Sequence, residues 1–489
     1  MAWSGDGRGL LGEGWFVRGG IDRIDPNLKA TRDPQAGRPV GRHTGMPRTG
    51  SAPPTDRARR AAVMLGLLLI VGAFAFALLY PLVLGHGCPC RDRDGRPVLV
   101  VATSRDFWDA VAAARYVASG ALGYIYESDR QLTALPLYPI LLAPLVAIGQ
   151  ALRLSEPPAP TATMYLLLAP FTVGLATPLL QQVRGLVRDA RAGASALSAQ
   201  VWTALLVGVP VLVVTGHGED VLALLLLLAA VRLAGRERWA AAGSLLGFAI
   251  ASKQWALLAL PALLASSPRR ERSKVAVAGL ALPAALAAFV LAVDWPHASR
   301  ALLHPPNYPA YGHAALWVDA GAATVTTAPF RLGVLALAAV LAGRVGRGAP
   351  PSRLLAVLGV TLLARGAFEP VVHVYYLAPG VCLLLLHERV TTGRCTRTAI
   401  LGGLLMAWFP AHPAPALWWA VAAPLGVAVA YRASREVLSG TTEPAGGGDA
   451  AVAVGQGTAD RSKPGVASDW PGPGRAIATS DGSVTGSHQ

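Results

Sequence analysis

Cysteine and lysine are both scarce in this chain. Of the 43 Lys and Arg residues only four are lysines, and the cysteines also number four. Four cysteines are too few for the disulfide framework of a small secreted domain, and the Cys88-Pro-Cys90 spacing bridges poorly. A disulfide-stapled fold is therefore excluded, and any lysine inside an apolar stretch becomes informative because so few are used.

Common nucleotide-binding motifs are missing as well. The chain has no Walker or dinucleotide fingerprint, and no DxD pair of the nucleotide-sugar enzymes in a predicted cytoplasmic domain. The net charge of +15 does not come with a basic face of interleaved aromatic residues, so we expect no nucleic-acid partner. No metal and no cofactor are expected either.

Apolar residues dominate what is present. Hydrophobic residues make up 53% of the chain, and its mean hydropathy of +0.44 is typical of an integral membrane protein. Apolar runs long enough to cross a hydrocarbon core of about 30 Å recur through residues 61–431. This body is predicted to be an all-α, polytopic transmembrane bundle. The polar segments 1–60 and 432–489 are expected to be disordered cytoplasmic tails, and no cleavable signal peptide is expected.

Clusters of arginine indicate the orientation of the bundle, because the cytoplasmic loops of membrane proteins contain an excess of Lys and Arg. The clusters lie at 184–191, 232–238, 269–274, 344–353, 389–397 and 432–435. All can be cytoplasmic only if 135–152 is a re-entrant or interfacial helix on the outer side. Residues 239–267 must also form two short helices that meet outside. About 12 transmembrane helices, within a range of about 10–13, then remain. They are expected at 62–84, 163–183, 195–215, 221–234, 239–251, 255–267, 275–293, 329–343, 354–368, 374–387, 398–410 and 416–431.

Two polar clusters interrupt the apolar runs on the predicted outer side. One is the Gly-His-Gly-Glu-Asp turn at 216–220, and the other is Lys253 with Gln254. An ionisable side chain at such depth costs about 2.5–3.5 kcal/mol, so it usually faces a partner or a water-filled cavity. Lys253 is predicted to hold a phosphate, although a snorkelling lysine that ends a helix would show the same pattern. The turn could contact a sugar, or Asp220 could merely cap the next helix.

Further polar residues are expected on the same side. Asp106 and Asp109, three apart on a helix, would share one side; they could supply a general base or only complement the helix dipole. Arg365, Glu369 and His373 follow an i, i+4, i+8 spacing that would stack them on one helical face, until the proline after Glu369 unwinds its end.

An aromatic loop is predicted at 294–328, and it contains His313. Aromatic and histidine side chains suit stacking on a sugar, but they are equally typical of a membrane interface. The pair Tyr375-Tyr376 is expected in the interfacial belt rather than in a site.

The order of these motifs resembles that of a known family. An acidic residue after the first span, a Tyr-Pro entering the next helix, a Gly-His turn, a Lys-Gln between short helices and a late Glu-x-x-x-His occur in sequence. Together they resemble the GT-C superfamily of polyprenyl-phosphate-sugar-dependent glycosyltransferases, in particular the bacterial polyprenol-phosphate-mannose-dependent mannosyltransferases. The similarity covers residues 62–431.

The resemblance implies an activity and roles for individual residues. A hexose, expected to be mannose, would pass with inversion from a polyprenyl-phosphate donor to a glycolipid or glycan acceptor on the outer face of the cell membrane. Asp106, or otherwise Asp109, would be the general base. The donor phosphate would be bound by Lys253, Gln254, Arg365 and His373. Other substrate contacts would come from His217, Glu219, Asp220, Glu369 and His313. Besides these two substrates, only membrane lipids are expected as partners.

A secondary transporter or lipid-sugar flippase is the alternative, because broken helices with buried charges also build transport sites. Transporters usually place such charges near the midplane and show internal repeats. Here the charges gather on one predicted face and no repeat relates the two halves, so the enzyme is favoured. A purely structural membrane scaffold would leave Lys253 and Glu369 without a role.

Overall fold

A computed structural model describes much of residues 64–438. The described ranges are 64–72, 105–126, 134–153, 160–191, 194–303, 306–307, 313–316, 318, 325–326, 328–408 and 415–438. Every described residue belongs to one compact unit, 56–489. The predicted tail 1–60, and residues 439–489 of the other tail, lie outside the described residues.

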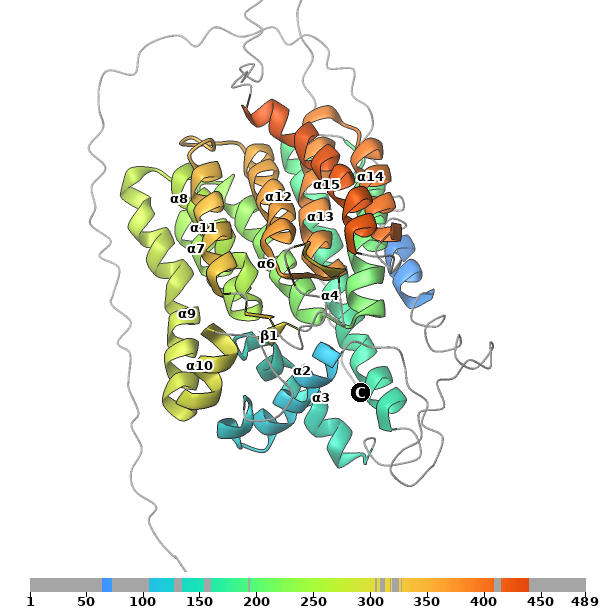
Figure 1. The fold of residues 1–489 in the computed structure, drawn as a ribbon, viewed down its shortest axis with the longest axis vertical. Coiled ribbons are helices and arrows are strands. Elements are labelled where there is room, and N and C mark those ends of the chain that lie inside the picture. The colour runs from blue at the N-terminus through green and yellow to red at the C-terminus, as the bar shows by residue number, and fades with distance from the viewer. Residues whose placement is uncertain are drawn as a thin grey trace, which may run out of the picture. The chain divides into compact units, whose positions relative to one another are not determined.

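The described part of the chain is all-α, as predicted (Figure 1). A helical segment at 64–72 comes first and lies within the predicted span 62–84. It is followed by α2 (Arg105–Ala118), η1 (Leu122–Tyr124), α3 (Leu137–Ala151), α4 (Pro160–Ala190), α5 (Leu197–Thr203) and the π-helical η2 (Ala204–Val214). The middle ones are α6 (Gly218–Ala234), α7 (Trp239–Ser252), η3 (Gln254–Ala259), α8 (Leu260–Ser266), η4 (Arg269–Glu271), α9 (Arg272–Val293) and α10 (Trp295–Leu303). The last are α11 (Ala328–Ala342), α12 (Pro351–Phe368), α13 (Val374–Thr392), α14 (Thr396–Trp408) and α15 (Pro415–Leu438). Each span predicted between 163 and 431 coincides with one of these helices or with a consecutive pair.

Two boundaries differ from the prediction. Helix α15 continues to Leu438, so 432–438 is not a disordered tail; these residues contain no proline or glycine, and nothing in their sequence stops the helix before Gly440. The segment predicted as the loop 294–328 contains helix α10. Asp294 begins it, because its Oδ1 accepts a hydrogen bond from the backbone N–H of His297 at 3.4 Å.

Two small antiparallel sheets lie in the same region. Strand β1 (Pro306–Asn307) pairs with β3 (Val325–Thr326), and β2 (His313–Ala314) pairs with β4 (Val371–Val372). The second pairing brings the segment after α10 against the break between α12 and α13.

Glycines allow the central helices to pack closely. A Cβ on Gly243 or Gly247 of α7 would lie 2.8 or 2.9 Å from a backbone oxygen of α9, which is closer than real Cβ contacts. Gly359 of α12 and Gly380 of α13 face each other in the same way, each hypothetical Cβ lying 3.1 Å from the other residue's carbonyl oxygen. Small residues at such positions let helix backbones approach and gain van der Waals contact.

The predicted break at Lys253 is present. Helix α7 ends at Ser252, Lys253 is extended (φ −152°, ψ 124°), and the chain resumes in η3. A second break precedes α6, where Gly216 has a positive φ of 67°, a conformation that favours glycine. Each break leaves polar backbone and side chains at the end of a helix, where they can line a cavity.

Several arginine-rich loops contact one another. Arg232 Nε and Arg236 each lie 2.7 Å from Asp189 Oδ2, which joins the last turn of α4 to the end of α6. Arg191 donates to the carbonyl of Val390 at 2.7 Å, which joins the loop after α4 to the end of α13. Partial burial alone would raise the pKa of the Asp189 carboxyl, but the hydrogen bonds and charges of Arg232 and Arg236 hold it below its ordinary value.

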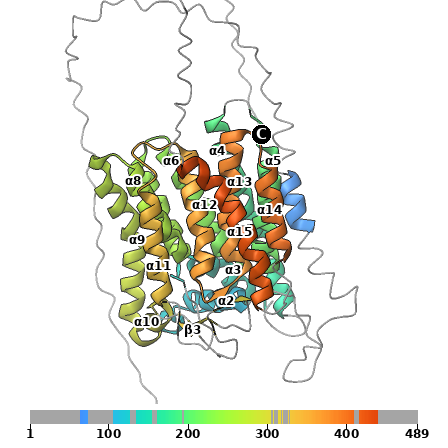
Figure 2. The same cartoon turned by 45° about the horizontal axis from the view of Figure 1, so that its top comes forward.

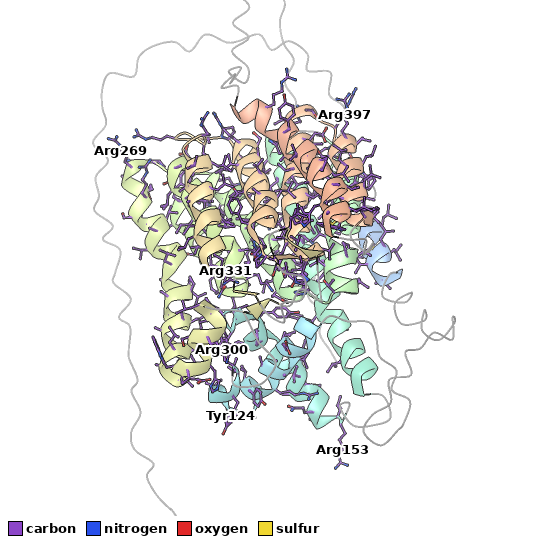
Figure 3. The ribbon with its side chains drawn as sticks, in the orientation of Figure 1. Tyr124, Arg153, Arg269, Arg300, Arg331 and Arg397 are labelled. Atoms are coloured by element: carbon purple, nitrogen blue, oxygen red, sulfur yellow. The ribbon has the colours of Figure 1, made fainter. Side chains whose placement is uncertain are left out.

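Arginine-rich loops lie at one end of the helices, and segments that were predicted on the outer side lie at the other. Figure 3 shows Arg269 and Arg397 at one end and Tyr124, Arg153 and Arg300 at the other. Helices α2, α3 and α10 also lie at this second end (Figures 1 and 2). Helix α3 was predicted to stay on the outer side, and that this end of the helices is the outer one stays a prediction.

One helix within the described ranges is long and apolar enough to cross a membrane by length and composition. It covers Arg269–Val293, has a mean hydropathy of 2.4 over its most apolar window, and has 22% of that window buried. Shorter apolar helices accompany it at Leu137–Ala151, Leu197–Val213, Trp239–Ser252, Gln254–Ser266, Arg331–Ala342 and Ala416–Tyr431. A single long apolar helix does not establish the predicted many-span topology.

Candidate functional site

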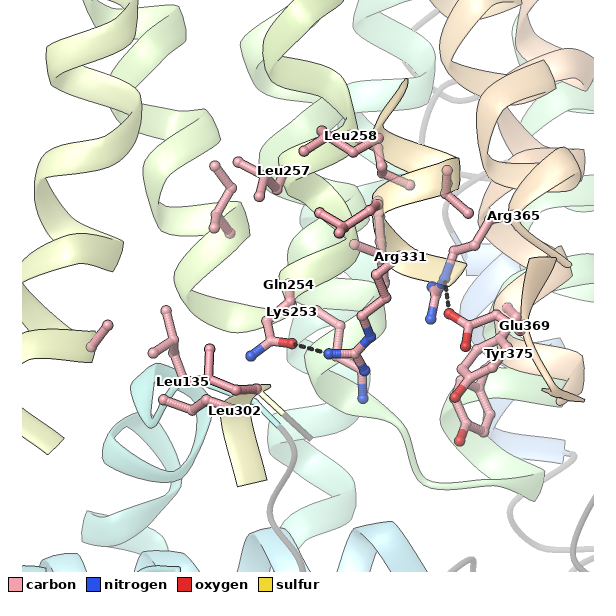
Figure 4. Close-up of a pocket in the computed structure, with 18 of the residues that line it drawn as sticks. Leu135, Lys253, Gln254, Leu257, Leu258, Leu302, Arg331, Arg365, Glu369 and Tyr375 are labelled. Carbon is pink, nitrogen blue, oxygen red and sulfur yellow. Dashed lines mark hydrogen bonds and ion pairs between the residues drawn. The ribbon is translucent and has the colours of Figure 1, made fainter. Parts of the chain in front are cut away.

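A cavity of about 440 Å³ lies where the helix breaks meet. Its polar side is formed by Lys253 and Gln254 at the break after α7, by Arg331 of α11, and by Arg365 and Glu369 at the end of α12 (Figure 4). Most of the remaining lining residues are apolar and together form its apolar wall, which consists of Leu135, Ile250, Leu257, Leu258, Ala287, Leu291, Leu302, Leu303, Leu332, Val334 and Leu335. The cavity therefore combines charge and hydrocarbon surface in one space.

A buried charge network adjoins this cavity. His217 Nδ1 lies 2.9 Å from Glu219 Oε1 and 3.4 Å from Asp220 Oδ2. Lys253 Nζ approaches the same two oxygens, at 3.0 and 3.4 Å. Trp255 donates its indole N–H to Asp220 Oδ1 at 2.6 Å. The two carboxylates are 6% and 1% exposed, so their charges depend on these partners rather than on water.

Two simpler interpretations of these residues are wrong. Asp220 does not cap α6, because the N-cap residue is His217. The His217 side chain makes no capping hydrogen bond either. Lys253 does not snorkel to the surface, because its side chain is 13% exposed and points to Glu219 and Asp220. Both residues are instead parts of the buried network.

Arg365 and Glu369 form an ion pair, with 2.8 Å between Nε and Oε1. The predicted unwinding of the helix at the proline after Glu369 is confirmed, since α12 ends at Phe368 and Glu369 is already extended. His373 joins the site from the start of α13, where its ring stacks on Tyr375 with 5.1 Å between centroids. Arg365 also lies 4.1 Å from the ring centroid of Tyr376.

The tyrosine pair was expected in an interfacial belt, but both rings line the cavity. Tyr375 is 7% exposed and stacks on His217 with 3.6 Å between ring centroids. It thus contacts both His217 and His373, which come from distant parts of the sequence. The two tyrosines lie at the start of a helix that follows a proline break, and this position in the sequence could have indicated that they line a cavity.

Arg331 is a site residue that the sequence argument missed. It lies on α11 and its NH1 donates to Gln254 Oε1 at 3.3 Å. In Figure 4 its guanidinium lies between Gln254 and the Arg365–Glu369 pair. An arginine at the beginning of an apolar helix, remote from the arginine-rich loops, was the available signal.

The remaining predicted residues lie on neighbouring elements. Asp106 and Asp109 are on α2, which packs on α3; Asp109 is 5% exposed, and the Asp106 side chain lies outside the described residues. The side chain of Tyr138 on α3 lies against Gly218, next to Glu219 and Asp220. The pair of helices α2 and α3 therefore packs beside the buried network. The backbone of His313 pairs with Val372, next to His373, although the His313 side chain is likewise outside the described residues.

His217, Glu219 and Asp220 could together hold a metal ion, because their ligand atoms lie within 4.8 Å of one another. Imidazole and carboxylate suit divalent transition metals. The ammonium of Lys253 already contacts both carboxylates, at 3.0 and 3.4 Å, so an ion would have to displace it. That no metal takes part remains a prediction.

Comparison with protein-family models, with curated proteins and with solved structures finds no match to this chain. Function must therefore be inferred from the residues and their geometry. Cationic side chains on one side of a cavity bind anions through charge-assisted hydrogen bonds, and a leucine wall binds hydrocarbon. The arrangement is suited to a ligand with an anionic group attached to an apolar chain.

Proposed function

We propose that this protein is a polytopic membrane glycosyltransferase of the GT-C type. It transfers a hexose, with mannose as the expected sugar, from a polyprenyl-phosphate donor to a glycolipid or glycan acceptor on the outer face of the membrane. The observation that carries the proposal is the amphipathic cavity, whose cationic residues and apolar wall match the phosphate and the polyprenyl chain of one donor molecule.

The surface of the helices supports a lipid environment. Val277 of α9 and Val340 of α11 are each 68% exposed. Large outward apolar side chains on several helices would be unfavourable in water and are ordinary in a bilayer. On this proposal the arginine-rich end is cytoplasmic, and the cavity opens toward the outer side. About 12 spans and an outer α3 complete the topology.

The proposed reaction needs a base and a stabilised leaving group. The acceptor hydroxyl oxygen attacks the anomeric carbon, the bond from that carbon to the phosphate oxygen breaks, and the polyprenyl phosphate leaves with the electron pair. The acceptor's proton passes to a carboxylate, which we assign to Asp106. Asp109 is less suited, because at 5% exposure it offers little room for an acceptor. Cationic residues of the cavity stabilise the departing phosphate.

The test is a transfer assay with the purified protein in proteoliposomes. Radiolabelled polyprenyl-phosphate mannose is added with a crude lipid and glycan extract, and label is followed into new products. The Asp106→Asn variant, at matched protein level, is the control. The proposal predicts label transfer by the wild type and little by the variant. Label that crosses the bilayer without entering any product would support the flippase instead and contradict the proposal.

A further inference from the structure

Three cationic side chains line the cavity, but they differ in how far their charge is already neutralised. Lys253 Nζ contacts Glu219 and Asp220 at 3.0 and 3.4 Å. Arg365 contacts Glu369 at 2.8 Å. The hydrogen bond of Arg331, within the described part of the chain, goes to the neutral amide of Gln254 at 3.3 Å. The positive charge of Arg331 is therefore the one least compensated by a direct carboxylate partner.

We infer that Arg331 is the main anion-binding residue of the cavity, and that Lys253 instead holds the two buried carboxylates in place. This inference rests on the proposed polyprenyl-phosphate donor and reassigns the residue that binds its phosphate. An anion bound at Lys253 would be repelled by both Glu219 and Asp220, whose oxygens already surround the ammonium. An anion at Arg331 meets the neutral amide of Gln254 as its direct partner. The nearby carboxylate of Glu369 also acts electrostatically on Arg331, but it is already paired with Arg365 at 2.8 Å.

The position of Arg331 also fits a lipid phosphate. Leu332 and Leu335, on the same helix, belong to the apolar wall of the cavity. A phosphate held by Arg331 therefore lies at the boundary between the polar side and the wall, where its attached chain can continue along the leucines. Arginine offers a planar fork of donors that can bind two phosphate oxygens at once.

The partner of Arg331, Gln254, can be replaced by a phosphate without breaking an ion pair. Its amide carries both an acceptor oxygen and an NH2 donor. When a phosphate arrives, Arg331 exchanges a neutral hydrogen bond for a charged one, and the Gln254 amide can turn to donate to the same phosphate. No ion pair has to break. Binding of the anion at Lys253, in contrast, would have to compete with two existing ion pairs.

The experiment measures binding of farnesyl phosphate to the full-length protein in detergent, by isothermal titration calorimetry, with farnesol as the uncharged reference. Arg331→Gln should weaken farnesyl phosphate binding by about 10- to 100-fold, the effect of losing a charged hydrogen bond, and leave farnesol unchanged. Arg331→Lys should recover part of the loss. Arg344→Gln, which changes an exposed arginine just beyond the other end of α11, is the matched control and should bind as the wild type does.

Lys253→Gln separates the two assignments. It should lower the melting temperature clearly while changing the preference for farnesyl phosphate over farnesol by less than Arg331→Gln does. If Arg331→Gln keeps the wild-type preference, or if Lys253→Gln loses it with an unchanged melting temperature, the inference is overturned. If Arg331→Gln loses the preference but the wild type transfers no sugar in the proteoliposome assay, the inference stands and the proposed function fails. A wild type without any preference for farnesyl phosphate would overturn both.

Discussion

Removing the charge of Lys253 is the strongest test of the buried network. Lys253→Met keeps an apolar stem of similar length but leaves Glu219 and Asp220 without the ammonium that lies 3.0 and 3.4 Å from their oxygens. Removing one partner of a buried ion pair typically costs about 3–5 kcal/mol, because the remaining charge stays desolvated. Since two carboxylates lose the same partner, we expect a loss of free energy of unfolding in the upper half of this range.

The measurement is the free energy of unfolding in detergent by denaturant titration, followed by tryptophan fluorescence. Adding Glu219→Gln to Lys253→Met should recover part of the loss, because one uncompensated charge disappears. Lys274→Met is the matched control. Lys274 is 60% exposed and its contact with Glu271, 3.2 Å long, should contribute less than about 1 kcal/mol. Equal and small losses in the Lys253 and Lys274 variants would refute the reasoning, since burial would then make no difference.

Three further changes test the catalytic base, the helix packing and the arginine end. Asp106→Asn should reduce sugar transfer by about 10²–10⁴-fold at matched protein level, while donor binding is kept. Asp109→Asn should reduce transfer less. If Asp109→Asn has the larger effect instead, the catalytic base is Asp109, one helical turn further along α2. Gly247→Ala should cost about 1–3 kcal/mol in thermal unfolding, because its Cβ would lie 2.9 Å from a backbone oxygen of α9, whereas Gly426→Ala, with nothing within 4 Å, should be neutral or stabilising. Asp189→Asn should lower the melting temperature at pH 7, and it should do so by less near pH 3. The lowered pKa of the Asp189 carboxyl stabilises the fold above the unfolded value of about 3.9, and this stabilisation disappears as the pH falls through the folded value. An equal effect of Asp189→Asn at both pH values would contradict this account.

Local patterns in the sequence predicted much of the architecture. Apolar runs located the helices, and the interruption at Lys253 predicted the break after α7, since a polar residue between two apolar segments is a local signal. The i, i+4 spacing placed Arg365 and Glu369 next to each other for the same reason, although their ion pair was not predicted. The helix end at Leu438 was missed because a polar sequence was read as disorder, although its residues favour helix.

The partners of the site residues could not be predicted in this way. Lys253 and Glu219 are 34 residues apart, and Arg331 and Gln254 are 77 apart, so no spacing rule connects them. A single sequence does not distinguish a lysine that binds a phosphate from a lysine that pairs with two carboxylates. Only the packing of α6 against α7 shows which anion Lys253 contacts. The stacking of Tyr375 on His217 depends on the same tertiary contacts.

The glycine contacts between helices have a mechanical consequence. Gly243 and Gly247 lock α7 to α9, and Gly359 and Gly380 lock α12 to α13, so each pair should move as one stiff body. The cavity lies between the two helix pairs, because Lys253 directly follows α7 and Glu369 directly follows α12. If the two pairs shift relative to each other, Lys253 and Glu369 move with them, and the volume of the cavity changes.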